Sequence, residues 1–302
     1  MLPIDQIQLN FNPGSLMLLN VILGLVMFGV ALDMRLTDFR HVLVTPKPVI
    51  IGIVAQFVFL PALTWAMTMI FRPAPSIALG MILVAACPGG NISNFITHYS
   101  RGNTALSVSM TAISTAVAIF MTPFNLTFWG SMNPDTDRLL TEIALDPLEM
   151  LLSVFLLLGV PLILGLLISH KATGVARKLR KPMRIFSMAV FGLFVLGALA
   201  ANWTHFLNYV GYFVLYVLAQ NAIALSTGYF SAFAAGLRET DRRAVAVEVG
   251  IQNSGLGLTL IFTFFHGLGG MALITAWWGI WHIISGMALG TFWSRRPPEE
   301  HV

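Results

Sequence analysis

The chain has 302 residues, of which 57% are hydrophobic and only 10% are charged. Soluble domains carry about 25% charged residues, so this composition excludes an ordinary globular domain and indicates a polytopic membrane protein. The single cysteine, Cys87, excludes an internal disulfide. No Lys or Arg precedes the first apolar run, so an N-terminal signal peptide is not expected.

Apolar runs of about 17–25 residues, the length that crosses a bilayer as an α-helix, occur nine times along the chain. Pro and Gly clusters separate several of them, and no long linker or low-complexity tract appears. The sequence therefore predicts an all-α membrane protein with nine transmembrane helices. The segments lie near residues 15–32, 49–71, 76–98, 104–129, 148–169, 184–201, 207–236, 242–265 and 271–293.

The basic residues divide unequally between the two sides of this topology. Of the 17 Lys and Arg residues, all except Arg72 and Arg138 fall on one side. Because cytoplasmic loops are enriched in Lys and Arg, we expect the N-terminus outside and the C-terminus in the cytoplasm. The basic loop at 171–184 is then a topology anchor, and no nucleic-acid partner is expected. Short loops favour a prokaryotic plasma membrane, which in bacteria is the inner membrane.

The third segment is interrupted by residues that a membrane helix should avoid, Cys-Pro-Gly-Gly-Asn-Ile-Ser-Asn at 87–94. Unpaired backbone groups are costly in hydrocarbon, so irregular backbone persists only where it lines a cavity or is buried in protein. Taken alone, the stretch is also compatible with a proline-kinked helix, a short loop or a glycosylation acceptor at 91–93.

The eighth segment carries a second interruption, Glu-Val-Gly-Ile-Gln-Asn-Ser-Gly at 248–255. The third and eighth segments are five spans apart, so they would cross the membrane in opposite directions. This pattern predicts an inverted-topology repeat with two crossing discontinuous helices, and places a substrate and ion site where they meet. A five-helix repeat whose first copy lacks one helix gives nine spans.

Glu248 is the one acidic residue that lies away from tails, loops and segment ends. It follows Asp241 by seven residues, which places it roughly 10 Å into the membrane. A carboxylate there costs about 2.5–3.5 kcal/mol and is a functional-site candidate, with a protonated structural Glu or a Glu paired to a buried base as the alternatives. No Lys or Arg lies deep within a segment, so the expected partner is a bound cation.

Oxygen ligands suited to a hard cation such as sodium occur in neighbouring segments. Gln56 supplies the only strong amide of the second segment. The fourth segment supplies a stripe of hydroxyl groups on one helical face, at Thr104, Ser107, Thr111 and Ser114. Such a stripe can alternatively serve hydrogen bonds between helices.

These residues resemble those of the bile acid:sodium symporter family, over essentially the whole chain. The similarity is carried by four stretches: Pro-Gly-Gly-Asn-Ile-Ser-Asn at 88–94, Ala-Leu-Ser at 105–107 with Thr111, the motif at 248–255, and Trp-His-x-x-Ser-Gly at 281–286. The sequence departs from the family at Ile283, where relatives often carry Asn after His282.

The resemblance implies two domains that move relative to each other. The core domain would comprise residues 49–129 and 207–293, with broken helices near 76–98 and 242–265. The panel domain would comprise residues 15–32 and 148–201.

The resemblance also implies two sodium sites that share Glu248. The first would use Ser93, Asn94, Ser107, Thr111 and Glu248. The second would use Gln56, Glu248 and Gln252, with the backbone carbonyl groups of Val249 and Ile251. Every side-chain position of both sets holds an oxygen ligand here. No organic cofactor is expected.

Two sodium ions and one carboxylate leave the site one positive charge, which an anionic substrate would neutralise. The N-termini of broken helices also favour anions. We therefore expect the region of Asn91, Asn253 and Ser254 to contact the acidic group of the substrate, and the resemblance adds His282. The expected function is symport of an organic anion by alternating access, with two Na⁺ per substrate. Bile acids, small carboxylates such as pantoate-like acids, and steroid sulfates all satisfy this description.

A proton-coupled exchanger or a sodium-independent efflux carrier on the same scaffold is the nearest alternative. An intramembrane enzyme is not expected, because no Ser–His pair, paired Asp residues or zinc-type His/Glu spacing is evident. The mechanism requires only a monomer in a lipid bilayer.

Overall fold

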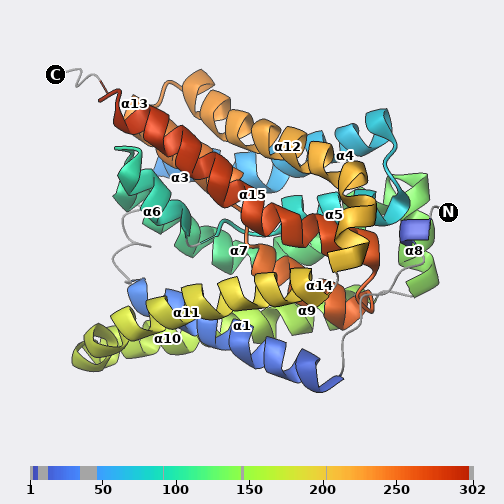
Figure 1. Ribbon diagram of the computed structural model, residues 1–302. Coiled ribbons are helices and arrows are strands. Elements are labelled where there is room, and N and C mark those ends of the chain that lie inside the picture. Colours follow the sequence, from blue (N-terminus) through green and yellow to red (C-terminus); the bar gives the residue numbers. More distant parts are fainter. Residues whose placement is uncertain are drawn as a thin grey trace.

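The structure is a computed structural model that describes residues 3–5, 13–34, 46–90, 92–143, 146–201 and 203–298. These residues form helices joined by short turns (Figure 1). Two five-residue π-helical turns, η2 and η3, interrupt longer helices. In chain order the elements are η1 (Pro3–Asp5), α1 (Pro13–Asp33), α3 (Pro46–Val54), η2 (Ala55–Phe59), α4 (Leu60–Phe71), α5 (Pro75–Ala86), α6 (Ile92–Tyr99), α7 (Thr104–Ser131), α8 (Pro134–Ile143), α9 (Pro147–Val154), η3 (Phe155–Gly159), α10 (Val160–Lys171), α11 (Thr173–Ala201), α12 (Trp203–Ala234), α13 (Glu239–Gly250), α14 (Ser254–Phe264) and α15 (Gly269–Ser294).

Five helical runs in the described ranges are long and apolar enough to cross a membrane. They are Pro46–Phe71, Thr104–Ser131, Leu148–Lys171, Phe213–Ala234 and Gly269–Ser294. Shorter apolar helices occupy Asn20–Leu32, Pro75–Ala86 and Ser254–Phe264. A 12-residue helix such as α5 reaches only about 18 Å, so a broken segment spans a bilayer only when both of its halves are counted. The regular elements of the described residues are therefore helices, several of them with the length and composition of membrane spans, and the count of nine spans stays a prediction.

The π-helical turns precede prolines within continuous helical runs. Pro61 follows η2 closely, and Pro161 stands in the same relation to η3. A proline lacks the backbone N–H, and its ring clashes with the carbonyl group one turn earlier, so a local widening of the helix relieves the contact. Gln56 lies within η2, and the altered turn sets the direction of its side chain.

The helices gather in two groups (Figure 1). In one group, α1, α10 and α11 pack against one another. In the other, α5 contacts α7 and α15, and α12 contacts α13 and α15. The first group meets the second where α1 contacts α14. A further contact joins α7 to α9 and η3, which precede α10 in the same helical run.

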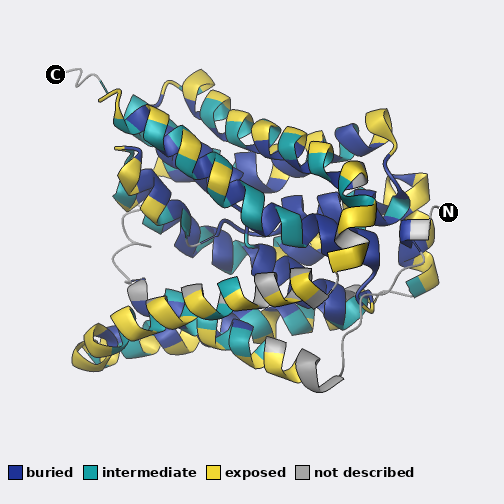
Figure 2. Ribbon diagram, in the orientation of Figure 1, coloured by how far each residue is buried: buried dark blue, intermediate teal, exposed yellow. Residues whose placement is uncertain are grey.

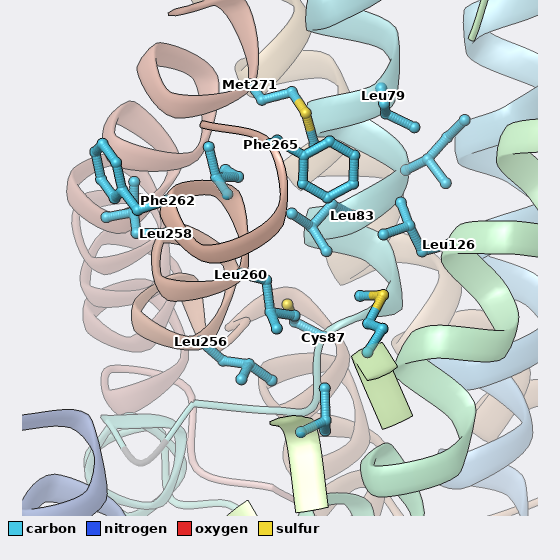
Figure 3. Packing of buried hydrophobic residues seen from close by; sticks show 14 of the residues in the cluster. Leu79, Leu83, Cys87, Leu126, Leu256, Leu258, Leu260, Phe262, Phe265 and Met271 are labelled. Carbon is cyan, nitrogen blue, oxygen red and sulfur yellow. The ribbon is translucent and has the colours of Figure 1, made fainter. Parts of the chain in front are cut away.

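Most of the two discontinuous segments lies in the interior of the molecule, whereas one face of α6 is exposed (Figure 2). All residues of α5 from Ser76 to Ala86 are buried, as are residues 243–250 of α13 and 254–262 of α14. Cys87 belongs to the same buried hydrophobic cluster as leucines of α5 and α14 (Figure 3). Protein therefore shields the irregular backbone, as a low-dielectric environment requires. Large apolar side chains such as Ile70, Phe120 and Leu215 are exposed on the outside, where lipid would cover them.

Candidate functional site

The two helix interruptions pair with each other. α5 ends at Ala86 and α6 begins at Ile92, while α13 ends at Gly250 and α14 begins at Ser254. The backbone N–H of Gly90 donates to the carbonyl oxygen of Ile251 at 2.7 Å, and that of Asn253 donates to the oxygen of Pro88 at 2.8 Å. Gly89 and Gln252 thereby form an antiparallel bridge. Each interruption thus satisfies backbone groups of the other.

The glycines of the first interruption permit this close approach. A Cβ atom at Gly90 would lie 2.9 Å from the carbonyl oxygen of Gln252. One at Gly89 would collide with the carboxylate of Glu248. Side chains are therefore excluded at both positions, and this is the physical reason for the Gly-Gly pair.

The carboxylate of Glu248 lies fully buried at this crossing and accepts hydrogen bonds from three hydroxyl groups. Ser93 Oγ donates to Oε2 at 2.6 Å, Ser107 Oγ lies 3.3 Å from the same atom, and Thr111 Oγ1 donates to Oε1 at 2.8 Å. Asn94 Oδ1 completes the cluster, lying 2.8 Å from Ser107 Oγ and 3.3 Å from Thr111 Oγ1. The structure therefore brings together all five residues predicted for the first sodium site.

The predicted hydroxyl stripe on α7 divides between two roles. Ser107 and Thr111 reach Glu248, whereas the other two members have different neighbours. Thr104 Oγ1 lies 3.5 Å from His98 Nδ1, and Ser114 Oγ donates to the carbonyl oxygen of Thr111 at 3.2 Å. Half of the stripe thus faces the buried carboxylate.

The residues predicted for the second sodium site form a reciprocal amide pair beside the crossing. Gln56 Nε2 donates to Gln252 Oε1 at 2.8 Å, and Gln252 Nε2 lies 3.3 Å from Gln56 Oε1. The amide nitrogens also donate to backbone oxygens, that of Gln56 to Cys87 at 2.8 Å and that of Gln252 to Val249 at 2.7 Å. The carbonyl oxygen of Ile251 accepts the bond from Gly90.

The residues predicted to contact substrate line the start of α14 and the middle of α15. Asn253 Oδ1 caps α14 by accepting from the backbone N–H of Leu256 at 3.0 Å, and its Nδ2 lies 3.7 Å from Met27 Sδ on α1. Ser254 Oγ and His282 Nδ1 are buried without a hydrogen-bond partner among the described residues. Asn91 lies outside the described residues.

Arg243 lies at the start of the predicted eighth segment, and the structure buries it within α13. Its guanidinium donates to Glu239 Oε1 at 2.9 Å and to the carbonyl oxygens of Ser100, Trp293 and Arg296 at 2.9, 3.2 and 2.9 Å. The guanidinium can be buried because these carbonyl oxygens and the Glu239 carboxylate accept hydrogen bonds from its N–H groups. Its hydrogen bonds are made to groups other than Glu248, whose carboxylate is bonded by the hydroxyl groups of Ser93, Ser107 and Thr111.

Two functional candidates were missed in the sequence. Asn221 Nδ2 on α12 donates to the carbonyl oxygen of Gly250 at 2.8 Å, and Ser285 Oγ on α15 donates to Asn221 Oδ1. The only signal for Asn221 is an amide pair with Gln220 inside an apolar run. Ser285 belongs to the 281–286 motif, which gave it no role.

Paired helix interruptions around a buried oxygen cluster are the arrangement expected of a membrane carrier. Residues 20–208 match the sequence profile of the Sodium Bile acid symporter family. The chain belongs to this family of sodium-dependent membrane transporters.

Relatives span bacteria, plants and animals. The chain is 30% identical over 278 residues to the uncharacterized sodium-dependent transporter YocS of Bacillus subtilis (strain 168), covering 92% of this chain and 83% of the relative. It is 29% identical over 279 residues to the probable sodium/metabolite cotransporter BASS1, chloroplastic, of Oryza sativa subsp. japonica, covering 92% and 66%. It is 27% identical over 245 residues to the ileal sodium/bile acid cotransporter of Homo sapiens, covering 80% and 68%.

Proposed function

We propose that this protein is a symporter that imports an organic anion together with two sodium ions bound at the helix crossing. One observation carries the proposal: the fully buried carboxylate of Glu248 has hydroxyl groups as its partners and sits among further oxygen ligands. A buried carboxylate needs a counter-charge, and the surrounding donor set suits a hard monovalent cation.

The first sodium ion would bind between Glu248 and the hydroxyl cluster. Hydroxyl groups are both donors and acceptors, so each can turn its proton away and present its oxygen to a cation. Thr111 Oγ1 already lies 3.0 Å from the carbonyl oxygen of Ser107, which can accept its hydrogen bond. The hydroxyl groups are thus hydrogen-bonded within the cluster, and rotation of their O–H bonds alone would present their oxygens to an ion.

The second sodium ion would bind beside the side-chain amides of Gln56 and Gln252, on the side where their nitrogen atoms lie. Gln252 Nε2 donates a hydrogen bond to the carbonyl oxygen of Val249, which is one of the predicted ligands. Rotation of the Gln56 and Gln252 amides would release this oxygen and present two amide oxygens in place of two nitrogens. We infer that the amide groups of Gln56 and Gln252, together with the Val249 carbonyl group, form the second site.

The anion would bind at the start of α14. Backbone N–H groups of the first turn and the partial positive charge of the helix end favour a carboxylate or sulfonate there. Ser254 Oγ and His282 Nδ1 offer buried hydrogen-bonding groups, and we assign both of them, with Asn253 and Asn91, to the substrate. The names of the relatives mention bile acids and metabolites, which supports an organic acid as cargo.

The proposal includes the architecture expected of such a carrier. We propose nine spans arranged as an inverted repeat, with the N-terminus outside and the C-terminus in the cytoplasm of a plasma membrane, the inner membrane if the cell is bacterial. The group of α1, α10 and α11 would belong to the panel domain, and the helices around the crossing to the core domain. A monomer suffices for this mechanism.

Uptake into proteoliposomes tests the function. With radiolabelled taurocholate and radiolabelled pantoate as probes, we expect an inward sodium gradient, but not a potassium gradient, to drive accumulation of at least one. Two sodium ions per monoanion carry one net charge, and each 100 mV of inside-negative potential favours entry by about 2.3 kcal/mol. A negative potential should therefore raise uptake.

Glu248→Gln should abolish the sodium-driven component, since it removes the charge that binds the ions. Ser109→Ala is the matched control, because Ser109 Oγ bonds only to the carbonyl oxygen of Ala105 within α7 in the described structure. It should transport like the wild type. Uptake driven by a pH gradient without sodium would contradict the proposal and support the proton-coupled alternative.

A further inference from the structure

The end of α13 presents three successive carbonyl groups, and each finds a different donor. The last carbonyl groups of an α-helix lack partners within the helix, so a buried helix end must find them elsewhere. The donors are Gln252 Nε2 for Val249 at 2.7 Å, Asn221 Nδ2 for Gly250 at 2.8 Å and Gly90 N for Ile251 at 2.7 Å. The middle carbonyl group, that of Gly250, is thus held from a separate helix.

Asn221 is fixed in orientation by α15. Its side chain is 1% exposed, and its Oδ1 accepts a hydrogen bond from Ser285 Oγ. Since an amide has one donor end and one acceptor end, this bond determines that the donor end faces Gly250. Ser285 Oγ also lies 3.2 Å from the carbonyl oxygen of His282. Ser285 and Asn221 therefore connect the turn of α15 that carries His282 to the end of α13.

Close packing of α12 on α13 supports this contact. Leu225 and Gly228 follow Asn221 at i+4 and i+7, on the same face of α12. A Cβ atom at Gly228 would lie 2.6 Å from the carbonyl oxygen of Val245, and one at Gly250 would collide with Leu225. The two backbones therefore approach closely at two levels, and Asn221 reaches the helix end from a fixed support.

We propose that Asn221, oriented by Ser285, is a positioning residue for the second sodium site. Because a peptide unit is planar, holding the Gly250 carbonyl oxygen also fixes the N–H of Ile251 and limits the torsions on either side. The carbonyl groups of Val249 and Ile251, assigned above as ion ligands, flank that unit. Asn221 thus sets the direction of two ligands that it does not touch. The inference rests on the proposed function of this site.

Sodium binding by the purified full-length protein tests the inference without a known substrate. The measured quantity is the thermal midpoint in increasing NaCl, with KCl keeping the ionic strength constant. Asn221→Leu preserves volume and removes the donor, so the sodium concentration for half-maximal stabilisation should rise about tenfold, as expected for an unpaired buried carbonyl group. Ser285→Ala should raise it by a smaller factor, and Ser285→Thr, which keeps the hydroxyl group, should restore it.

The adjacent Gln220 supplies the matched control. It is also buried on α12, and its Nε2 donates to the carbonyl oxygen of Met81 at 2.9 Å, a bond of the same kind away from the crossing. Gln220→Leu should lower the thermal midpoint without changing the half-maximal sodium concentration.

An unchanged sodium response in Asn221→Leu would overturn the inference. Should that variant fail to fold, an unchanged response in Ser285→Ala would do the same. If the wild type itself shows no stabilisation specific to sodium, the proposed function fails, and the inference fails with it.

Discussion

At the scale of single residues, the site depends on small side chains packed around one carboxylate. Gly89 leaves the space that Glu248 occupies, since a Cβ atom there would lie 2.8 Å from the carboxylate carbon and closer still to Oε1. The backbone at Gly89 is also tied into the bridge with Gln252, so it cannot easily withdraw. Any added methyl group must therefore displace the carboxylate.

Gly89→Ala should accordingly weaken sodium binding without removing a ligand. Overpacking of this kind costs about 1–3 kcal/mol, so we expect the half-maximal sodium concentration in the thermal assay to rise about tenfold. Gly24→Ala on α1 is the matched control, because its nearest neighbour would be 3.9 Å from the new Cβ atom. Equal sodium responses of both variants would show that Glu248 does not sit in the ion site.

The site residues that could be predicted from the sequence are those whose chemistry is unusual for a membrane segment. The buried carboxylate and the residues after the Gly-Gly pair stand out in an apolar run. The position of each hydroxyl group was harder to predict, because a stripe on α7 extends along the helix while the carboxylate occupies one depth. Ser114 lies about 10 Å along the helix from Ser107, too far to share its partner. Asn221 was missed because only the fold reveals that its partner is a helix end.

At the scale of elements, Arg243 connects the ends of three helices, α6, α13 and α15. Arg243 is only 3% exposed. Its guanidinium donates hydrogen bonds to the carbonyl oxygen of Ser100, which follows α6, and to those of Trp293 and Arg296 at the end of α15. Glu239 of the same helix balances its charge. The planar group also lies over the ring of Trp293, with 5.6 Å from the guanidinium carbon to the ring centroid. A single side chain thereby closes the end of α13 opposite to the crossing.

Arg243→Lys should lower the thermal midpoint by several degrees, because an ammonium group cannot reproduce this set of directed donors. Each lost hydrogen bond to a charged group costs about 1.5–3 kcal/mol. Arg242→Lys is the control: its side chain is 24% exposed, and its 3.8 Å ion pair with Glu239 is worth little. A similar fall in both midpoints would show that burial of Arg243 adds no stability.

Elements with long apolar runs were predictable, and those defined by local geometry were not. Gly marked both interruptions, and Pro88 marked the first as well, because neither residue favours a helix interior. The helix α8 was missed, since it begins with Asp135 and Asp137 and lacks the apolar length of a span. Its start is instead defined by Asn133, whose Oδ1 accepts from the backbone N–H of Asp135 at 3.0 Å. The π-helical turns leave no periodic signal in the sequence.

At the scale of the whole molecule, the basic clusters lie at one end (Figure 1). The turn between α10 and α11, the start of α13 and the end of α15 are all at that end, whereas α8 lies at the other. These segments carry Lys171, Arg177, Arg242 and Arg295, and α8 carries Arg138. The arrangement agrees with the sidedness argued from the sequence. Which end faces the cytoplasm stays a prediction.

Movement of the panel against the core predicts a difference between two buried positions on α1. Met27 contacts Asn253 at the crossing, whereas Ala31 packs against Gly165 of α10, within the same group. In a Cys87→Ala background, Met27→Cys should react with a permeant maleimide at a rate that changes with sodium and taurocholate. Ala31→Cys should stay protected throughout. Equal reactivity at both positions in every condition would contradict movement of the panel as a body.

The bridge between the two interruptions also constrains how the gene can vary. Gly90 and Asn253 each donate to the opposite segment, so the two segments are held in one register. In an extended pair, a shift of one residue turns every side chain to the other face. Loss or gain of one codon in either segment would therefore rotate Gln252 away from Gln56 and break the cluster at Glu248. A change in the length of one segment would therefore need a compensating change in the other.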